Sequence, residues 1–228
     1  MPKYKSTDNR GQFKLRIEQE LLPNTPPLPI GTFSLIYADF PVRYELRETD
    51  ETHRGRTPYP TMSDKEILKF PLGTLSTEDA YLLCWATKDH LHLTLHCFEA
   101  WGFKYVNLIP WLKTTIQGDK LRIGIGHYGR NCFEPLLLGI KGNPGSFTSL
   151  GLTNIPGVFL EQEEAAIFAP RNDHSTKPES SYLLAERLHQ AMTAKGILGE
   201  RIELFARRQR PNWTCWGAEL QQQGVLDA

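Results

Sequence analysis

The sequence predicts an α/β fold in which helices flank a mostly parallel sheet. Five apolar runs have the length and composition of buried strands, at residues 35–38, 80–86, 103–111, 132–140 and 201–206. Stretches with helical periodicity lie between some of these runs, around residues 89–102 and 178–196. Because the first helical stretch lies between two strands, we interpret it as the crossover of a βαβ unit, which should be right-handed.

The first apolar run is the one at which we expect a ligand site. It stops abruptly on Asp39, and Pro41 prevents its continuation as a central strand. Open α/β sheets bind their ligands at the carboxyl ends of parallel strands, which is where Asp39 would lie. Asp and Pro are also ordinary turn residues, so a structural turn at Asp39 is the alternative.

The chain is interpreted as an N-terminal extension over residues 1–30 followed by one domain over residues 31–228. The extension is polar and becomes rich in proline toward its end. Residues 43–60 are charged and lack periodicity, as functional or disordered loops do. Ser63 and Glu66 then form a capping box, which predicts a short surface helix.

Two longer helices are predicted further along the chain. Asp89 is expected to cap the first, which ends at Gly102 and carries on one face Leu91, Leu95 and Phe98. Pro178 suits the first position of the second, which ends at Gly196 and carries on one face Leu184, Leu188, Ala191 and Met192. Residues 143–160, between these helices, are interpreted as a linker rich in glycine and proline.

Residues 114–130 form a basic, glycine-rich stretch. No acidic residue occurs between Lys120 and Phe133, whereas Arg122 and Arg130 add positive charge. A basic loop beside a ligand edge suits the phosphate backbone of a nucleic acid, and a solvated hairpin is the alternative. The glycine spacing fits neither a dinucleotide motif nor a P-loop, which argues against a nucleoside triphosphate.

The composition limits the classes of partner and compartment. Lysine and arginine (26 together) balance aspartate and glutamate (26 together), so nucleic acid would have to bind to local basic patches. The four cysteines show no close pairing, and we interpret them as free thiols in a reducing compartment; no metal site is predicted. Neither a signal peptide nor a membrane span is visible, so we expect a cytoplasmic protein.

Eight short blocks occur in an order that is far more specific than any one of them. They are IYAD at 36–39, YPTMS at 59–63, LCWAT at 83–87, AWGF at 100–103, EPLLLG at 134–139, HSTKPE at 174–179, ELFAR at 203–207 and WTCWGAE at 213–219. In this order, from about residue 31 to residue 220, the chain resembles the MT-A70 type of adenine amino-methyltransferase. That family includes the eukaryotic messenger-RNA adenosine methyltransferase and its bacterial and phage DNA relatives.

The resemblance implies a Rossmann-like methyltransferase fold in permuted order, with the catalytic motif ahead of the cofactor motif. It implies S-adenosylmethionine as cofactor and adenine in nucleic acid as substrate, with DNA favoured over RNA because compact members are typically bacterial or phage. An adenine in a duplex must leave the stack to reach such a site. Asp39 matches the acceptor of a hydrogen bond from the adenine amine, within a catalytic motif that also contains Phe40 and Pro41. The positions that match the cofactor site are Asp39, Lys177, Phe205, Arg207 and Glu219.

The chain departs from the family pattern at two places. The family motif Asp-Pro-Pro-Trp reads Asp-Phe-Pro-Val, so Val42 replaces an aromatic whose stacking on a base is worth ~1–3 kcal/mol. Phe40 is a candidate substitute for that aromatic. The family sequence Trp-Gly-Asn-Glu reads Trp-Gly-Ala-Glu, and the Ala218 side chain forms no hydrogen bond. The chain is therefore either an adenine methyltransferase or a degenerate homologue, which binds nucleic acid or forms a homodimer or heterodimer with another methyltransferase subunit.

Overall fold

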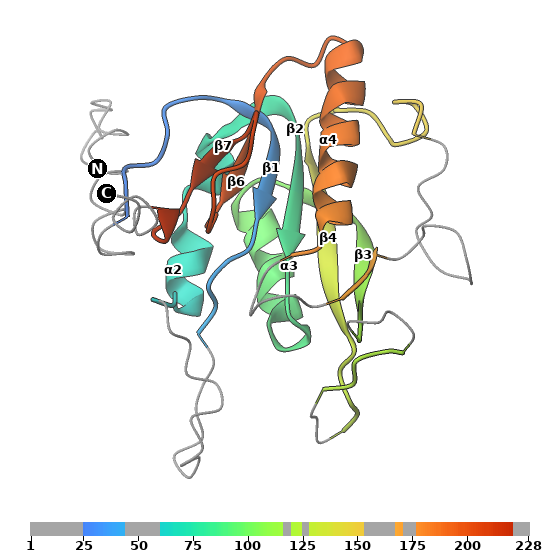
Figure 1. Ribbon diagram of the computed structural model, residues 1–228. Coiled ribbons are helices and arrows are strands. Elements are labelled where there is room, and N and C mark those ends of the chain that lie inside the picture. Colours follow the sequence, from blue (N-terminus) through green and yellow to red (C-terminus); the bar gives the residue numbers. More distant parts are fainter. Residues whose placement is uncertain are drawn as a thin grey trace, which may run out of the picture.

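Seven strands form one mixed sheet in the computed structural model, which describes residues 25–43, 60–115, 120–124, 128–152, 167–170 and 177–220. The strand order is β5-β3-β4-β2-β1-β6-β7 (Figure 1). Within the described ranges only β4 runs against the other strands, because it pairs antiparallel with β2 and β3. The prediction of an α/β fold with a mostly parallel sheet is confirmed. The strands are β1 (Phe33–Ala38), β2 (Ser76–Trp85), β3 (Lys104–Thr114), β4 (Phe133–Lys141), β5 (Ile167–Pro170), β6 (Glu200–Leu204) and β7 (Thr214–Trp216).

Helices cover both faces of the sheet. Helix α4 (Glu179–Ala194) lies on one face, and α2 (Asp64–Lys69) and α3 (Leu91–Ala100) lie on the other (Figure 1). Side chains alternate between the two faces of a strand, so β1 contributes to two separate cores. Ile36 and Ala38 belong to the core beneath α2 and α3, whereas Leu35 and Tyr37 belong to the core beneath α4.

Helix boundaries follow the predicted capping signals in three cases, one of which is Gly196 just after α4, with a φ of 82°. At the start of α2, the Glu66 carboxylate accepts hydrogen bonds from the backbone N–H and the hydroxyl of Ser63, at 2.6 and 2.7 Å. At the end of α3, Gly102 has a φ of 78°, in the left-handed region that glycine adopts most easily. The predicted cap at Asp89 is wrong. Asp89 lies inside a 3-10 turn over Lys88–His90, and α3 begins only at Leu91.

The predicted βαβ unit contains an additional strand. β2 and β3 point in the same direction, but β4 lies between them and pairs with both. The sequence did not predict this arrangement because the periodicity of a strand does not indicate the direction in which it pairs. β5 and β7 were also not predicted, since runs of three or four residues give too short a pattern.

Two predicted segments fall wholly or mainly outside the described residues: the extension over residues 1–30 and the loop over residues 43–60. The part of the first segment that is described packs on the domain, because Leu28 is buried and the Pro26 carbonyl accepts a hydrogen bond from Trp216 Nε1 at 2.8 Å. All four cysteines are free thiols. In the ranges that the structure describes, no helix is long and apolar enough to cross a membrane.

Candidate active site

The carboxyl ends of three parallel strands meet at one edge of the sheet. Ala38 is the last residue of β1, and it lies in register with Cys84 on β2 and with Leu204 on β6. Asp39 and Phe205 follow these strand ends directly, so they leave the sheet beside one another. This is the edge at which α/β sheets bind ligands.

The antiparallel strand β4 brings its amino end to the same edge. Leu136 of β4 lies opposite Trp85 at the end of β2, so Glu134 reaches the edge from the opposite direction. A pocket opens at this edge. It is lined by Asp39, Phe40, Pro41, Val42, Pro60, Thr87, Glu134, Lys177, Phe205, Ala206, Arg207, Ala218 and Glu219.

Every residue that the sequence suggested for catalysis or for cofactor binding lines this pocket. They come from the end of β1, the start of α4, the end of β6 and the segment after β7. Their roles remain predictions, but the structure brings them together in one place. The three residues suggested for nucleic-acid binding (Lys120, Arg122 and Arg130) are not among the lining residues.

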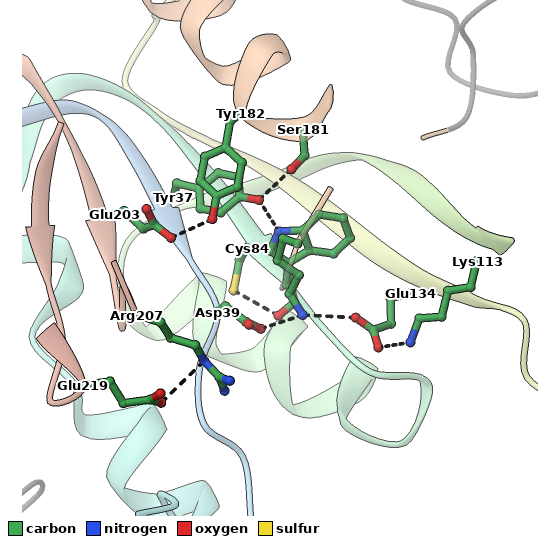
Figure 2. A network of polar contacts seen from close by, with 12 residues as sticks. Tyr37, Asp39, Cys84, Lys113, Glu134, Ser181, Tyr182, Glu203, Arg207 and Glu219 are labelled. Atoms are coloured by element: carbon green, nitrogen blue, oxygen red, sulfur yellow. Dashed lines mark hydrogen bonds and ion pairs between the residues drawn. The ribbon is translucent and has the colours of Figure 1, made fainter. Parts of the chain in front are cut away.

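A row of ion pairs runs along one wall of the pocket. The Lys177 ammonium group lies 3.1 Å from Asp39 Oδ1 and 3.0 Å from Glu134 Oε2. The other Glu134 oxygen pairs with the ammonium group of Lys113, at the end of β3. Figure 2 shows Glu134 between Lys113 and the Asp39 side of the site. The Lys177 side chain is only 8% exposed, so its carboxylate partners compensate a buried charge.

The members of this row differ in how firmly they hold their charge. Burial raises the pKa of the Asp39 carboxyl above its ordinary value, against the opposing effect of Lys177. Burial also disfavours the charged form of Glu134, but Lys177 and Lys113 outweigh it and lower the pKa of Glu134. For Lys177, burial is outweighed by Asp39 and Glu134, which raise its pKa to about 12. Of the two carboxylates in the row, Asp39 is therefore the one that accepts a proton more easily.

The opposite wall is formed where β6 ends and the chain returns after β7. Arg207 Nε lies 3.4 Å from Glu219 Oε1, and both side chains are about a third exposed, at 31% and 35%. Phe205 has a φ of 62°, an uncommon conformation for a residue other than glycine. Position 217 requires a glycine because two backbone segments come close together there. A Cβ at this position would lie 2.2 Å from the Ala206 carbonyl oxygen. This wall is thus shaped by two tightly packed backbone segments.

The altered catalytic motif has a definite conformation. The Phe40 ring is 8% exposed and packs among the rings of Trp101, Phe205 and Phe70, with centroids 5.0, 4.6 and 5.6 Å away. It contributes to the core beneath the pocket, where these other aromatic rings cover it. Val42 lines the pocket, and a backbone bridge ties it to Met62.

The described residues 120–124 and 128–130 of the basic stretch form an exposed extension of β3 and β4, which we call the hairpin. Thr114 pairs with Leu121, and the Arg122 N–H donates to the Lys113 carbonyl at 2.7 Å. Lys120, Arg122 and Arg130 are all exposed on it. Figure 1 shows the hairpin extending from the edge of the sheet at which β1 and β2 end. Lys113 lies at the junction, since its side chain pairs with Glu134 and its backbone begins the hairpin.

Sequence reasoning missed Glu134 and Lys113 as site residues. Glu134 directly precedes an apolar run, and Lys113 directly follows one, so each marks a strand end. Nothing in the sequence says that these two strands form a hairpin, which is what brings the start of one and the end of the other to the edge with Asp39. The polar residues at both ends of every strand are the signal that could have found them.

Comparison with known proteins identifies the family of this chain. The sequence profile of the family described as MT-A70 matches residues 33–219. The human N(6)-adenosine-methyltransferase catalytic subunit METTL3 is 30% identical over 203 residues, which are 87% of this chain and 30% of the relative. The N(6)-adenosine-methyltransferase MT-A70-like protein of Arabidopsis thaliana is 30% identical over 196 residues, which are 84% of this chain and 24% of the relative.

A more distant relative is named for adenine rather than adenosine. The human N(6)-adenine-specific methyltransferase METTL4 is 25% identical over 194 residues, which are 83% of this chain and 38% of the relative. This chain thus spans well under half the length of each of these relatives. The family match covers most of the chain and includes both walls of the pocket, from β1 to Glu219. The chain therefore belongs to the MT-A70 family.

Proposed function

We propose that the protein transfers a methyl group from S-adenosylmethionine to the 6-amino group of adenine in nucleic acid, with DNA favoured over RNA. One observation carries the proposal. A carboxylate that ends a buried strand, Asp39, faces a pocket lined by every position at which the family resemblance implies cofactor binding. The names of the relatives, which are adenosine and adenine methyltransferases, support the same reaction.

The residues present fit the cofactor. S-adenosylmethionine ends in an amino acid with both an ammonium and a carboxylate group, and the pocket offers a carboxylate and a cation side by side in Asp39 and Lys177. Its ribose carries two hydroxyl groups, for which Glu219 is a suitable acceptor. Phe205 and Val42 supply apolar surface for uncharged parts of the ligand. When bound, the cofactor supplies the methyl group on a positively charged sulfur.

The chain contributes positioning and electrostatics to the reaction. Transfer of a methyl group to an amine is an in-line displacement, which is accelerated mainly by holding the reactants in line. Asp39 accepts a hydrogen bond from the adenine amine, which orients the lone pair of that nitrogen, and it stabilises the positive charge that develops there. The methylated amine then loses a proton to water. Lys177 keeps Asp39 oriented through their 3.1 Å contact. The target adenine has to be flipped out of a duplex first, or to lie in a single strand.

The exposed hairpin supplies the nucleic-acid contacts in this proposal. Lys120, Arg122 and Arg130 lie on a hairpin at the pocket edge, in a protein of zero formal net charge. Alanine at both arginines should reduce the salt dependence of DNA or RNA binding by roughly one unit for each phosphate interaction that is removed. Lys195→Ala is the control, because it removes an exposed charge just after α4, away from the hairpin. An unchanged salt slope in the arginine variant would exclude the hairpin from the interface.

A degenerate partner subunit is the second candidate, and a specific observation favours it. The ring of Phe40 is packed into the core, so Val42 remains where the family motif has its stacking aromatic. Ala218 lines the pocket without a side chain that forms hydrogen bonds. In this function the chain binds nucleic acid or pairs with an active methyltransferase. Its free cysteines support a cytoplasmic location in either case.

Two measurements separate these functions. Calorimetry with S-adenosylmethionine tests binding, and incorporation of tritiated methyl groups into adenine-rich DNA and RNA tests transfer, with and without a partner subunit. The proposed enzyme binds the cofactor and transfers methyl groups alone, and Asp39→Asn abolishes transfer without unfolding the protein. Absence of both binding and transfer would refute it and support the degenerate subunit.

The structure also improves the design of a gain-of-function variant. Restoring the whole family motif would replace Phe40 by proline, and the loss of its packed ring would cost about 3–5 kcal/mol. Val42→Trp alone restores an aromatic in the pocket and leaves that core intact. If the chain is an enzyme, we expect this variant to bind single-stranded DNA more tightly and to transfer methyl groups faster, because stacking on the base is gained.

A further inference from the structure

The Lys177 ammonium group is held from three directions before the amino end of α4. It contacts the carboxylates of Asp39 and Glu134, and it lies 5.2 Å from the centre of the Trp85 ring. Cation and ring attract one another at this distance. Because the side chain is almost fully buried, its position depends on these groups and on the backbone where α4 begins. Whatever fixes the Trp85 ring and the Pro178 backbone therefore also fixes the cation that faces Asp39.

Tyr37 connects these two supports through a buried chain of hydrogen bonds. The Trp85 indole N–H can only donate, so it donates to the Tyr37 hydroxyl, at 2.6 Å. The Ser181 hydroxyl donates to the Pro178 carbonyl at 2.6 Å, which uses its one proton. The contact of 2.7 Å between Tyr37 and Ser181 therefore has Tyr37 as donor. Figure 2 shows the Tyr37 hydroxyl directed toward Ser181.

The Tyr37 hydroxyl keeps its proton, so it can donate to Ser181 at all times. The side chain is fully buried, and burial raises the pKa of Tyr37 far above its ordinary value, so the proton stays in place. Tyr37 lies on β1 two residues before Asp39, which directly follows this strand, so one short segment carries both the carboxylate and the hydroxyl that supports Lys177. Removing the hydroxyl would deprive the indole N–H of its acceptor, and a buried donor without an acceptor is costly.

We propose that Tyr37 is a positioning residue for Lys177, because its hydroxyl sets the plane of the Trp85 ring and the start of α4 and thereby holds the ammonium group against Asp39. The proposal rests on the proposed function only for its effect on the reaction. The position of the Lys177 ammonium group should depend on the Tyr37 hydroxyl whether or not the protein is a methyltransferase.

Tyr182 provides a matched control in the same core. Its ring stacks on that of Tyr37, with centroids 4.6 Å apart, and its hydroxyl donates to Glu203 Oε1 at 2.7 Å. Tyr182→Phe therefore removes a buried hydroxyl that bonds to Glu203. Tyr37→Phe removes the buried hydroxyl that bonds to Trp85 and Ser181, the two supports of Lys177. Ser181→Ala is a second test variant, which interrupts the link from Tyr37 to Pro178.

The experiment records the 15N ammonium signal of Lys177 and the indole N–H signal of Trp85 by NMR in each variant, together with Tm, cofactor Kd and kcat. Tyr37→Phe and Tyr182→Phe should lower Tm by similar amounts. Only Tyr37→Phe and Ser181→Ala should shift or broaden the Lys177 signal and lower kcat, by about ten- to a hundredfold for Tyr37→Phe. In the double variant, the effects of Tyr37→Phe and Ser181→Ala on the Lys177 signal should not add, because both substitutions interrupt the same series of hydrogen bonds.

Two results would overturn the proposal. One is an unchanged Lys177 signal in Tyr37→Phe, and the other is an equal change in Tyr182→Phe. If the wild-type protein neither binds the cofactor nor transfers methyl groups, the proposed function fails, and the Lys177 signal alone then decides the positioning role of Tyr37.

Discussion

The two walls of the pocket are built in different ways. On one wall, Asp39, Lys177, Glu134 and Lys113 form a row of ion pairs that is mostly buried. On the other wall, Arg207 and Glu219 form one pair at 3.4 Å that is about a third exposed. The Lys177 side chain is 8% exposed and its partners Asp39 and Glu134 are 28% and 18% exposed, so water screens the Arg207–Glu219 pair more than the contacts of Lys177.

This difference separates preformed groups from adaptable ones. A buried charge that loses its partner is left uncompensated, so the Lys177 wall keeps its geometry before any ligand arrives. A pair that is about a third exposed gains little from its own contact, so Arg207 and Glu219 can exchange that contact for one with a ligand. We therefore expect substitutions on the first wall to affect stability, and substitutions on the second to affect mainly binding.

The largest effect on stability should come from Lys177→Met. The variant leaves Asp39 and Glu134 without their shared cation, and breaking a buried pair costs about 3–5 kcal/mol of unfolding free energy. Denaturation by urea measures the loss. Lys195→Met, at an exposed lysine just after α4, is the control and should stay within about 0.5 kcal/mol of wild type. A cost below about 1 kcal/mol for Lys177→Met would contradict the view of this wall as preformed.

Gly217→Ala should have the next largest effect, on the other wall. Its Cβ would lie 2.2 Å from the Ala206 carbonyl oxygen, so the backbone has to move, at a cost of about 1–3 kcal/mol. Because the movement displaces Ala218 and Glu219, cofactor affinity should fall as well. Gly129→Ala serves as control, since no atom of the described residues lies within 4 Å of the Cβ that it adds. Equal unfolding midpoints for the two variants would show that the backbone at Gly217 is not closely packed against the backbone at Ala206.

Arg207→Ala should separate binding from stability. The pair with Glu219 is about a third exposed, so the variant should lose less than about 1 kcal/mol of unfolding free energy. If the proposed function holds, the Kd for S-adenosylmethionine should rise about tenfold, as expected for the loss of one hydrogen bond to a charged group. Thermal unfolding and calorimetry test the two parts. A large loss of stability with unchanged affinity would contradict the view that the Arg207–Glu219 wall serves binding more than stability.

The smallest effect concerns the pH dependence of Asp39→Asn. Burial raises the pKa of Asp39 in the folded protein, so the folded state holds this proton more tightly than the unfolded chain. Charging Asp39 as the pH rises from about its ordinary pKa of 3.8 therefore costs stability, and the variant avoids this cost. Relative to wild type, the variant should gain stability between pH 4 and pH 7, measured by urea denaturation. A difference that is constant or falls with pH would contradict the sign of the pKa shift.

The sequence by itself determined the elements and the family. Apolar runs and capping residues act within a few positions of the chain, so the main strands, the capping box at Ser63 and the end of α3 at Gly102 were predictable. The ordered blocks identified the residues around the pocket, because they include the ends of the strands that form its edge. Asp39 was found for the same reason, as a carboxylate at the end of a buried strand.

Only the tertiary structure decided which groups meet. Glu134 reaches Lys177 because β4 runs antiparallel, and strand direction is set by pairing between distant segments rather than by periodicity. Phe40 turns into the core because three aromatic rings from other elements surround it. The link from Tyr37 to Ser181 joins β1 to α4 across 144 positions of sequence, and such a contact exists only once the helix has packed on the sheet.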